Sequence, residues 1–168
     1  MMGTYQSNWR STWLMVAAGG PLVLGAALGV PFGVRRIVTE SVLLPGLVIG
    51  LSLMMAPALY IGMSLAGAAP PASRVAAAVG RGLRASGTTM AGLAPATAFL
   101  LSTTLWHGSV YVFGLLAVGG AMLAGIHALW RALGTDAGKR ARAIAVFGVW
   151  SAVSLGLGTH LFISMLGA

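Results

Sequence analysis

Residues 109–130 read SVYVFGLLAVGGAMLAGIHALW and contain no charged side chain. A helix needs about 20 predominantly apolar residues to cross the hydrocarbon core of a bilayer, so this stretch predicts a membrane-spanning helix. Four further uncharged, apolar stretches have a similar length, at 13–34, 41–66, 88–106 and 143–166. The sequence therefore predicts an all-α, polytopic transmembrane bundle of five spans that forms a single integral membrane domain over 1–168.

The composition indicates that any function lies within or beside the membrane. Charged residues make up 7% of the 168 residues and hydrophobic residues 58%, which is too little charge to cover a water-soluble fold. The short segments between the spans leave no room for a soluble catalytic or ligand-binding domain. Because the chain has no cysteine, disulfides and thiolate metal sites are excluded. The abundance of alanine, glycine and arginine is typical of a GC-rich bacterial genome, so we expect the bacterial cytoplasmic (inner) membrane.

The positive charges are distributed unequally between the two sides of the predicted bundle. When the connecting segments are assigned alternately to two sides, Arg35 and Arg36 lie on one side and eight of the ten cations lie on the other. These eight are Arg10, Arg74, Arg81, Arg84, Arg131, Lys139, Arg140 and Arg142. Since Lys and Arg mark the cytoplasmic side, we expect a cytoplasmic N-terminus and an outer C-terminus. The first apolar stretch is longer than a typical signal-peptide core, so we expect it to be retained.

The segment between the second and third spans has two different faces. Val75, Val79 and Leu83 recur every four residues, whereas the arginines at 74, 81 and 84 share the opposite face. This pattern predicts a short amphipathic helix at the membrane interface, although a solvated connector also fits. We expect Arg74, Arg81, Arg84, Lys139, Arg140 and Arg142 to contact anionic lipid headgroups. The same topology explains the net charge of +8 without nucleic-acid binding.

Stripes of small residues recur at four-residue spacing, and the one in the fourth span consists of Ala117, Ala121 and Gly125. The first span carries Gly25, Gly29 and Gly33, and the last carries Gly148, Ala152 and Gly156. Small residues on one helix face let a second backbone approach closely. The stripes therefore predict helix packing, either within the chain or against a partner subunit or a second copy.

The few titratable side chains indicate no catalytic centre. His107, His160 and Glu40 are expected on the outer side of the membrane, where they could bind a divalent metal or handle a proton. However, no single helix carries two of them at ligand spacing, and the favoured explanation is ordinary placement, as turn residues plus one packed histidine. His127 lies near the opposite end from His160, so a haem held by both is geometrically awkward. No cofactor is predicted, and haem or a divalent metal remains an alternative.

The layout resembles the Yip1-like membrane proteins. The features that carry this resemblance are five spans and a basic segment, Arg74 to Arg84, that leads into Gly92, Leu93, Ala94 and Pro95. The chain lacks the longer N-terminal region of the eukaryotic members. The resemblance implies a non-enzymatic membrane protein that recruits partners or organises membranes.

These observations together favour a non-catalytic protein that acts as an accessory or scaffold subunit of a larger inner-membrane complex. The expected partners are membrane lipids, including anionic ones, and other integral membrane proteins, with no nucleic acid. One alternative is an oligomeric transport or channel component, in which the prolines within the spans would provide hinges. A second alternative is a redox subunit that binds metal or haem.

Overall fold

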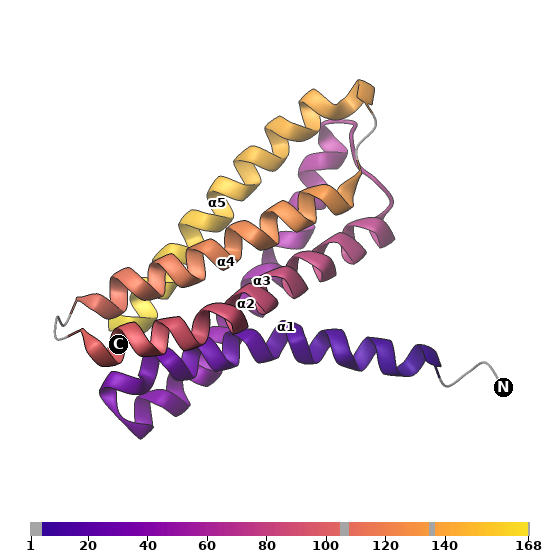
Figure 1. The fold of residues 1–168 in the computed structure, drawn as a ribbon. Helices are drawn as coiled ribbons and strands as arrows, with labels where there is room; N and C mark the ends of the chain where they lie inside the picture. Colours follow the sequence, from indigo (N-terminus) through magenta and orange to yellow (C-terminus); the bar gives the residue numbers. More distant parts are fainter. Residues whose placement is uncertain (1–4, 105–107, 135–136, 168) are drawn as a thin grey trace.

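The computed structural model describes residues 5–104, 108–134 and 137–167, and this part of the chain is helical, with no strand (Figure 1). The elements in chain order are α1 (Tyr5–Gly29), the 3₁₀ turn η1 (Val30–Phe32), α2 (Val34–Leu65), α3 (Ala72–Thr103), α4 (Ser109–Leu133), the 3₁₀ turn η2 (Ala137–Lys139) and α5 (Arg140–Gly167). Three of these helices, α2, α4 and α5, are long and apolar enough to cross a membrane. The structure thus supports the prediction of an all-α membrane protein.

Successive helices run in alternating directions, so the connections gather at two ends (Figure 1). The η1 turn, the α3–α4 connection and the C-terminus lie at one end. The α2–α3 and α4–α5 connections lie at the other, which we call the basic end because five cations occur beside these connections. They are Arg74, Arg131, Lys139, Arg140 and Arg142.

Helix α3 differs from the sequence prediction. The sequence predicts a short interfacial helix followed by a separate third span, but one helix of 32 residues runs without a break from Ala72 to Thr103. The prediction is wrong on this point because the inward face of the basic segment continues into the span at three- and four-residue spacing. The buried residues on this face are Val75, Ala78, Gly82, Ser86, Met90, Ala94, Thr97 and Leu101. The amphipathic character itself is confirmed, since Arg74, Arg81 and Arg84 are all exposed.

Two glycines with left-handed backbone conformations flank α2, one just before its first turn and one just after its last turn. Gly67, with φ of +65°, follows the last turn of α2. Its N–H donates to the carbonyl of Ser64, and the N–H of Ala68 donates to the carbonyl of Met63. These two bonds form a Schellman motif, which satisfies carbonyls that the helix leaves free. Gly33, with φ of +91°, joins η1 to α2. The two turns set the directions of α2 and of its neighbours.

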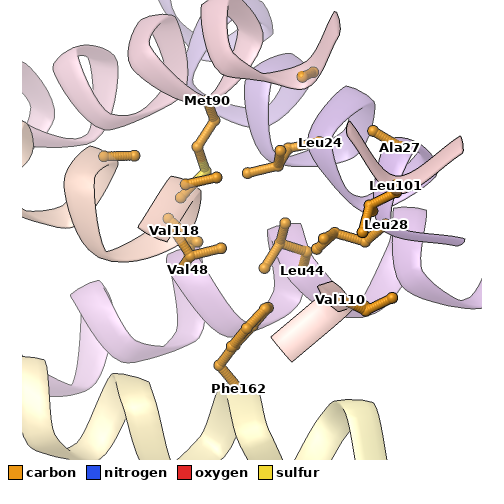
Figure 2. Close-up of a cluster of buried hydrophobic side chains, with 13 residues drawn as sticks. Leu24, Ala27, Leu28, Leu44, Val48, Met90, Leu101, Val110, Val118 and Phe162 are labelled. Atoms are coloured by element: carbon orange, nitrogen blue, oxygen red, sulfur yellow. The ribbon is translucent and has the colours of Figure 1, made fainter. Parts of the chain in front are cut away.

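Buried apolar side chains form two clusters along the bundle. The first draws on all five helices and includes Leu24, Leu44, Met90, Val118 and Phe162 (Figure 2). The second cluster lies nearer the basic end, and its members come from α2, α3, α4 and α5 and from the segment after α2. They are Leu59, Met63, Ala68, Val75, Ala78, Leu129, Leu133, Ala143 and Phe147. Among the side chains that the structure describes, those of α1 contribute to the first cluster.

Candidate functional site

The glycine stripe of α1 packs inside the chain. A Cβ atom added at Gly25 would clash with the backbone carbonyl of Glu40, and one added at Gly29 would clash with the backbone of Ile37. The two glycines therefore let α1 lie directly on α2, as expected for internal packing. Gly33 does not share this role, since a Cβ there would meet nothing within 4 Å. The structure assigns Gly25 and Gly29 to an internal contact and Gly33 to a turn.

The small-residue stripe of α5 points away from the rest of the chain. Gly148, Ala152 and Gly156 are all exposed, and a Cβ at either glycine would have no neighbour within 4 Å among the described residues. The inward face of α5 is formed by other residues, namely Ala143, Phe147, Ser154, Gly158 and Phe162. The stripe is thus an open surface among the described residues, on the helix that packs against α2 and α4.

The candidate metal ligands are not brought together by the described part of the chain. Within it, no group of three or more His, Cys, Asp or Glu side chains is placed to hold a metal ion. His160 is exposed on α5, Glu40 is buried in α2, and His107 lies outside the described residues. The two histidines considered for haem, His127 and His160, are both exposed, on α4 and α5. The geometry of the described residues therefore gives no support to a metal or haem site.

Glu40 is the buried carboxylate of the described fold, with 1% of its surface exposed. Its Oε1 atom accepts a hydrogen bond from Nη1 of Arg36 at 3.3 Å, one helical turn away. Its Oε2 atom is buried and has no hydrogen-bond partner in the described residues. A buried carboxylate is costly unless it is paired, so the guanidinium of Arg36 is its main stabilising neighbour.

Removal of this neighbour is expected to destabilise the fold. Arg36→Gln leaves the buried carboxylate without a counter-ion, which we expect to lower the free energy of unfolding by about 1–3 kcal/mol. Glu40→Gln removes the buried charge at nearly constant volume, so we expect a smaller effect. Unfolding of the two single variants and of the double variant in detergent measures the coupling. If Arg36→Gln costs as much in the Glu40→Gln background as in the native chain, the pair contributes nothing.

A cavity of about 70 Å³ lies inside the bundle between α2, α3, α4 and α5. Its lining is mainly apolar, including Leu51, Met122 and Leu129, but three serines also border it. They are Ser52, Ser86 and Ser154. The hydroxyl of Ser154 is buried and has no partner in the described part of the chain. The cavity is too small to hold a substrate of ordinary size, for which sites of about 300–1,000 Å³ are usual.

A groove of about 470 Å³ runs along the outside of the bundle between α2 and α5. Its lining is apolar and consists of Met55, Ala58, Gly62, Ala145, Val146, Val149, Trp150 and Val153. Met55 and Trp150 border both this groove and the internal cavity. They are also joined directly, because the indole Nε1 of Trp150 donates to the carbonyl of Met55 at 2.7 Å. These two residues therefore form the wall between the groove and the cavity.

Aromatic rings fix Trp150 in this position. The ring of Phe147 lies between Trp130 of α4 and Trp150, with centroid separations of 4.8 Å and 5.6 Å. Such tilted pairs are favourable beyond the area that they bury. The row of three rings ties α4 to α5 and holds the indole against α2.

The basic residues predicted to contact lipid headgroups are exposed. Arg74, Arg81 and Arg84 lie on the outer face of the first turns of α3, while Lys139, Arg140 and Arg142 surround the start of α5. Their placement on the surface of the basic end agrees with that expected role. Contact with headgroups itself stays a prediction.

Several close contacts were missed in the sequence. Gly20 of α1 lies against the backbone of Gly87 in α3, and Gly82 of α3 lies against Gly125 of α4. Gly125 belongs to a small-residue series with Ala117 and Ala121, so a packing face on α4 could be recognised. Gly20 and Gly87 belong to no such series, so the sequence pattern did not predict their contact.

Comparison of the chain with models of known protein families finds no match. Neither the curated proteins nor the solved structures contain a match to this chain. The resemblance to Yip1-like proteins thus stays a prediction.

Proposed function

We propose that this protein is a non-catalytic accessory or scaffold subunit of a larger assembly in a bacterial inner membrane. The observation that carries the proposal is the uncovered face of Gly148, Ala152 and Gly156 on α5. In the same chain, other glycines lie against the backbone of a neighbouring helix, namely Gly20, Gly25 and Gly29 of α1, Gly82 of α3 and Gly125 of α4. A helix of a partner protein would cover the exposed small-residue face of α5 in the same way.

The physics of helix association in lipid supports this role for a small-residue face. Lipid tails are as apolar as a leucine side chain, so helices gain little by hiding apolar surface from them. Close backbone approach provides van der Waals packing instead, and small residues allow it. A face made of glycine and alanine is therefore suited to another helix.

The proposal includes five spans with the basic end in the cytoplasm. Helices α2, α4 and α5 have the length and composition of spans. In α3, residues 85–103 carry no charge and extend over about 28 Å, close to the ~30 Å hydrocarbon thickness. Its three arginines would then reach the headgroup layer. The cations at the basic end favour the cytoplasmic side under the positive-inside rule.

The experiment is affinity purification from native membranes in mild detergent, with mass spectrometry of the proteins recovered. We expect stoichiometric membrane partners from the native chain and their loss from Ala152→Trp, because the indole would prevent close approach of a helix. The matched control is Ala96→Trp, at an exposed position on α3. We expect the control to retain the partners. The amount of partner protein recovered with it should be at least about tenfold higher than with Ala152→Trp.

Other outcomes would contradict the proposal. Equal recovery from both variants would show that the α5 face binds no partner. A clean homo-oligomer would favour the transport alternative, for which the prolines inside helices offer support, and liposome flux would then be measured. These prolines are Pro21, Pro45, Pro57 and Pro95. A visible absorption band or bound metal in the purified protein would favour the redox alternative.

A further inference from the structure

The apolar groove between α2 and α5 is aligned with a cation at the basic end. Arg142, Val146, Val149 and Val153 follow one another at spacings of four, three and four residues, which places them on one face of α5. The three valines line the groove, and Arg142 is exposed one turn closer to the basic end. The groove therefore has a positive charge at its mouth and an apolar interior.

The length of this arrangement matches one leaflet of a bilayer. From Arg142 to Val153 the helix rises about 16 Å, and half of the hydrocarbon core is about 15 Å. The lining of the groove extends from Ala145 to Val153 on α5 and from Gly62 to Met55 on α2. A chain entering beside Arg142 could thus extend to the middle of the membrane.

The lining specifies the chemistry of the occupant. Both walls present apolar side chains, and the indole N–H of Trp150 is already used by the carbonyl of Met55. The groove therefore suits a hydrocarbon chain and offers no hydrogen bond to a polar one. At the mouth, Arg142 and its exposed neighbours Lys139 and Arg140 carry three positive charges, which suit an anionic group.

We propose that the groove between α2 and α5 binds one acyl chain of an anionic phospholipid, whose headgroup phosphate pairs with Arg142. Trp150 and Met55 form the floor under the acyl chain, and Gly62 lets α2 lie close to Val146 beside it. The bound lipid fills the outer seam between α2 and α5, so it stabilises the contact between these helices. This site borders the small-residue stripe, since Val149 and Val153 directly follow Gly148 and Ala152 along α5.

The test is native mass spectrometry of the full-length protein, released from bilayers containing phosphatidylglycerol and phosphatidylcholine with identical acyl chains. We expect phosphatidylglycerol to be retained in preference to phosphatidylcholine. Arg142→Gln is expected to lower this retention about fivefold, the effect of one cation near an anionic surface. The matched control is Arg131→Gln, which removes an exposed charge from the same end of the bundle but on α4, outside the residues expected to contact headgroups, and we expect little change.

Substitutions that fill the groove with a larger side chain test whether the acyl chain lies there. Ala58→Phe places a ring in the groove from α2, and Val149→Trp fills the same space from α5. We expect either variant to lose both phospholipids from the site, whereas Ala91→Phe, at an exposed position on α3, keeps them. Two variants are used so that a folding defect in one leaves the other as the test.

Two results would overturn the proposal. If Arg142→Gln and Arg131→Gln lower the retention of phosphatidylglycerol equally, the preference reflects general attraction to a basic surface. If both groove-filling variants retain phospholipid as the native chain does, the acyl chain lies elsewhere.

Discussion

Gly20→Ala is expected to destabilise the protein by about 3 kcal/mol, near the upper end of overpacking effects. The new methyl group would overlap the backbone carbonyl of Gly87, so α1 and α3 would have to move apart. Backbone atoms cannot rotate away as a side chain can, which is why a single methyl group has so large an effect. Thermal unfolding in detergent, followed by circular dichroism, measures the loss.

The neighbouring residue provides a control with the same chemistry. A Cβ at Gly19 would meet nothing within 4 Å, so Gly19→Ala adds the same atom without a clash. Because alanine favours a helix over glycine, we expect Gly19→Ala to be neutral or to stabilise by up to about 1 kcal/mol. Equal destabilisation by the two variants would contradict the crossing of α1 and α3 at Gly20.

Phe162→Ala is expected to lower the free energy of unfolding by about 2–3 kcal/mol. Phe162 (Figure 2) is 1% exposed and is the largest of the fully buried side chains among the described residues. Its ring lies against Gly114 of α4. Truncation of a buried aromatic side chain leaves a cavity whose walls lose their contacts. The expected loss is below that of a water-soluble protein because the unfolded reference is in lipid.

The control for this prediction is Phe99→Ala. Phe99 is 67% exposed on α3, so its removal opens no cavity and we expect a change below about 0.5 kcal/mol. Unfolding of both variants by the same detergent titration compares them directly. A loss of the same size from Phe99→Ala would mean that the phenylalanine content, and not packing in the core, determines stability.

The helices were predictable from the sequence because uncharged apolar stretches and helices largely coincide. The stretch 109–130 corresponds to α4 and the stretch 143–166 to α5, with small differences at the ends. The differences arise at charged residues, such as Arg140 and Arg142, where the backbone hydrogen bonds of a helix continue after the apolar side chains end. Apolar composition locates the lipid-facing part of a helix, and hydrogen bonding sets its full length.

The continuity of α3 could not be recognised from apolar stretches. The change from a charged to an uncharged outer face at residues 84–88 predicts the start of a new helix. The inward face does not change there, since Gly82, Ser86 and Met90 continue a single buried line. A helix boundary needs a break in the backbone, and neither proline nor a left-handed glycine occurs at that point.

Small-residue spacing predicted faces of close approach but not what covers them. Gly25 with Gly29 and Gly148 with Gly156 show the same pattern, yet the first pair contacts α2 and the second contacts no described residue. The difference depends on where each helix lies in the bundle. The candidate groove was likewise unpredictable, because its walls come from α2 and α5, which are distant in the sequence.

The close contact between α1 and α2 implies an order of assembly during synthesis. Gly29 and Ile37 are only eight residues apart, so this hairpin closes a short loop at small entropic cost. Contacts of such low sequence separation form fast, and N-terminal segments fold first as the chain is made. The α1–α2 hairpin can therefore be complete before α3 leaves the ribosome, and Gly20 then presents a finished surface on which Gly87 docks.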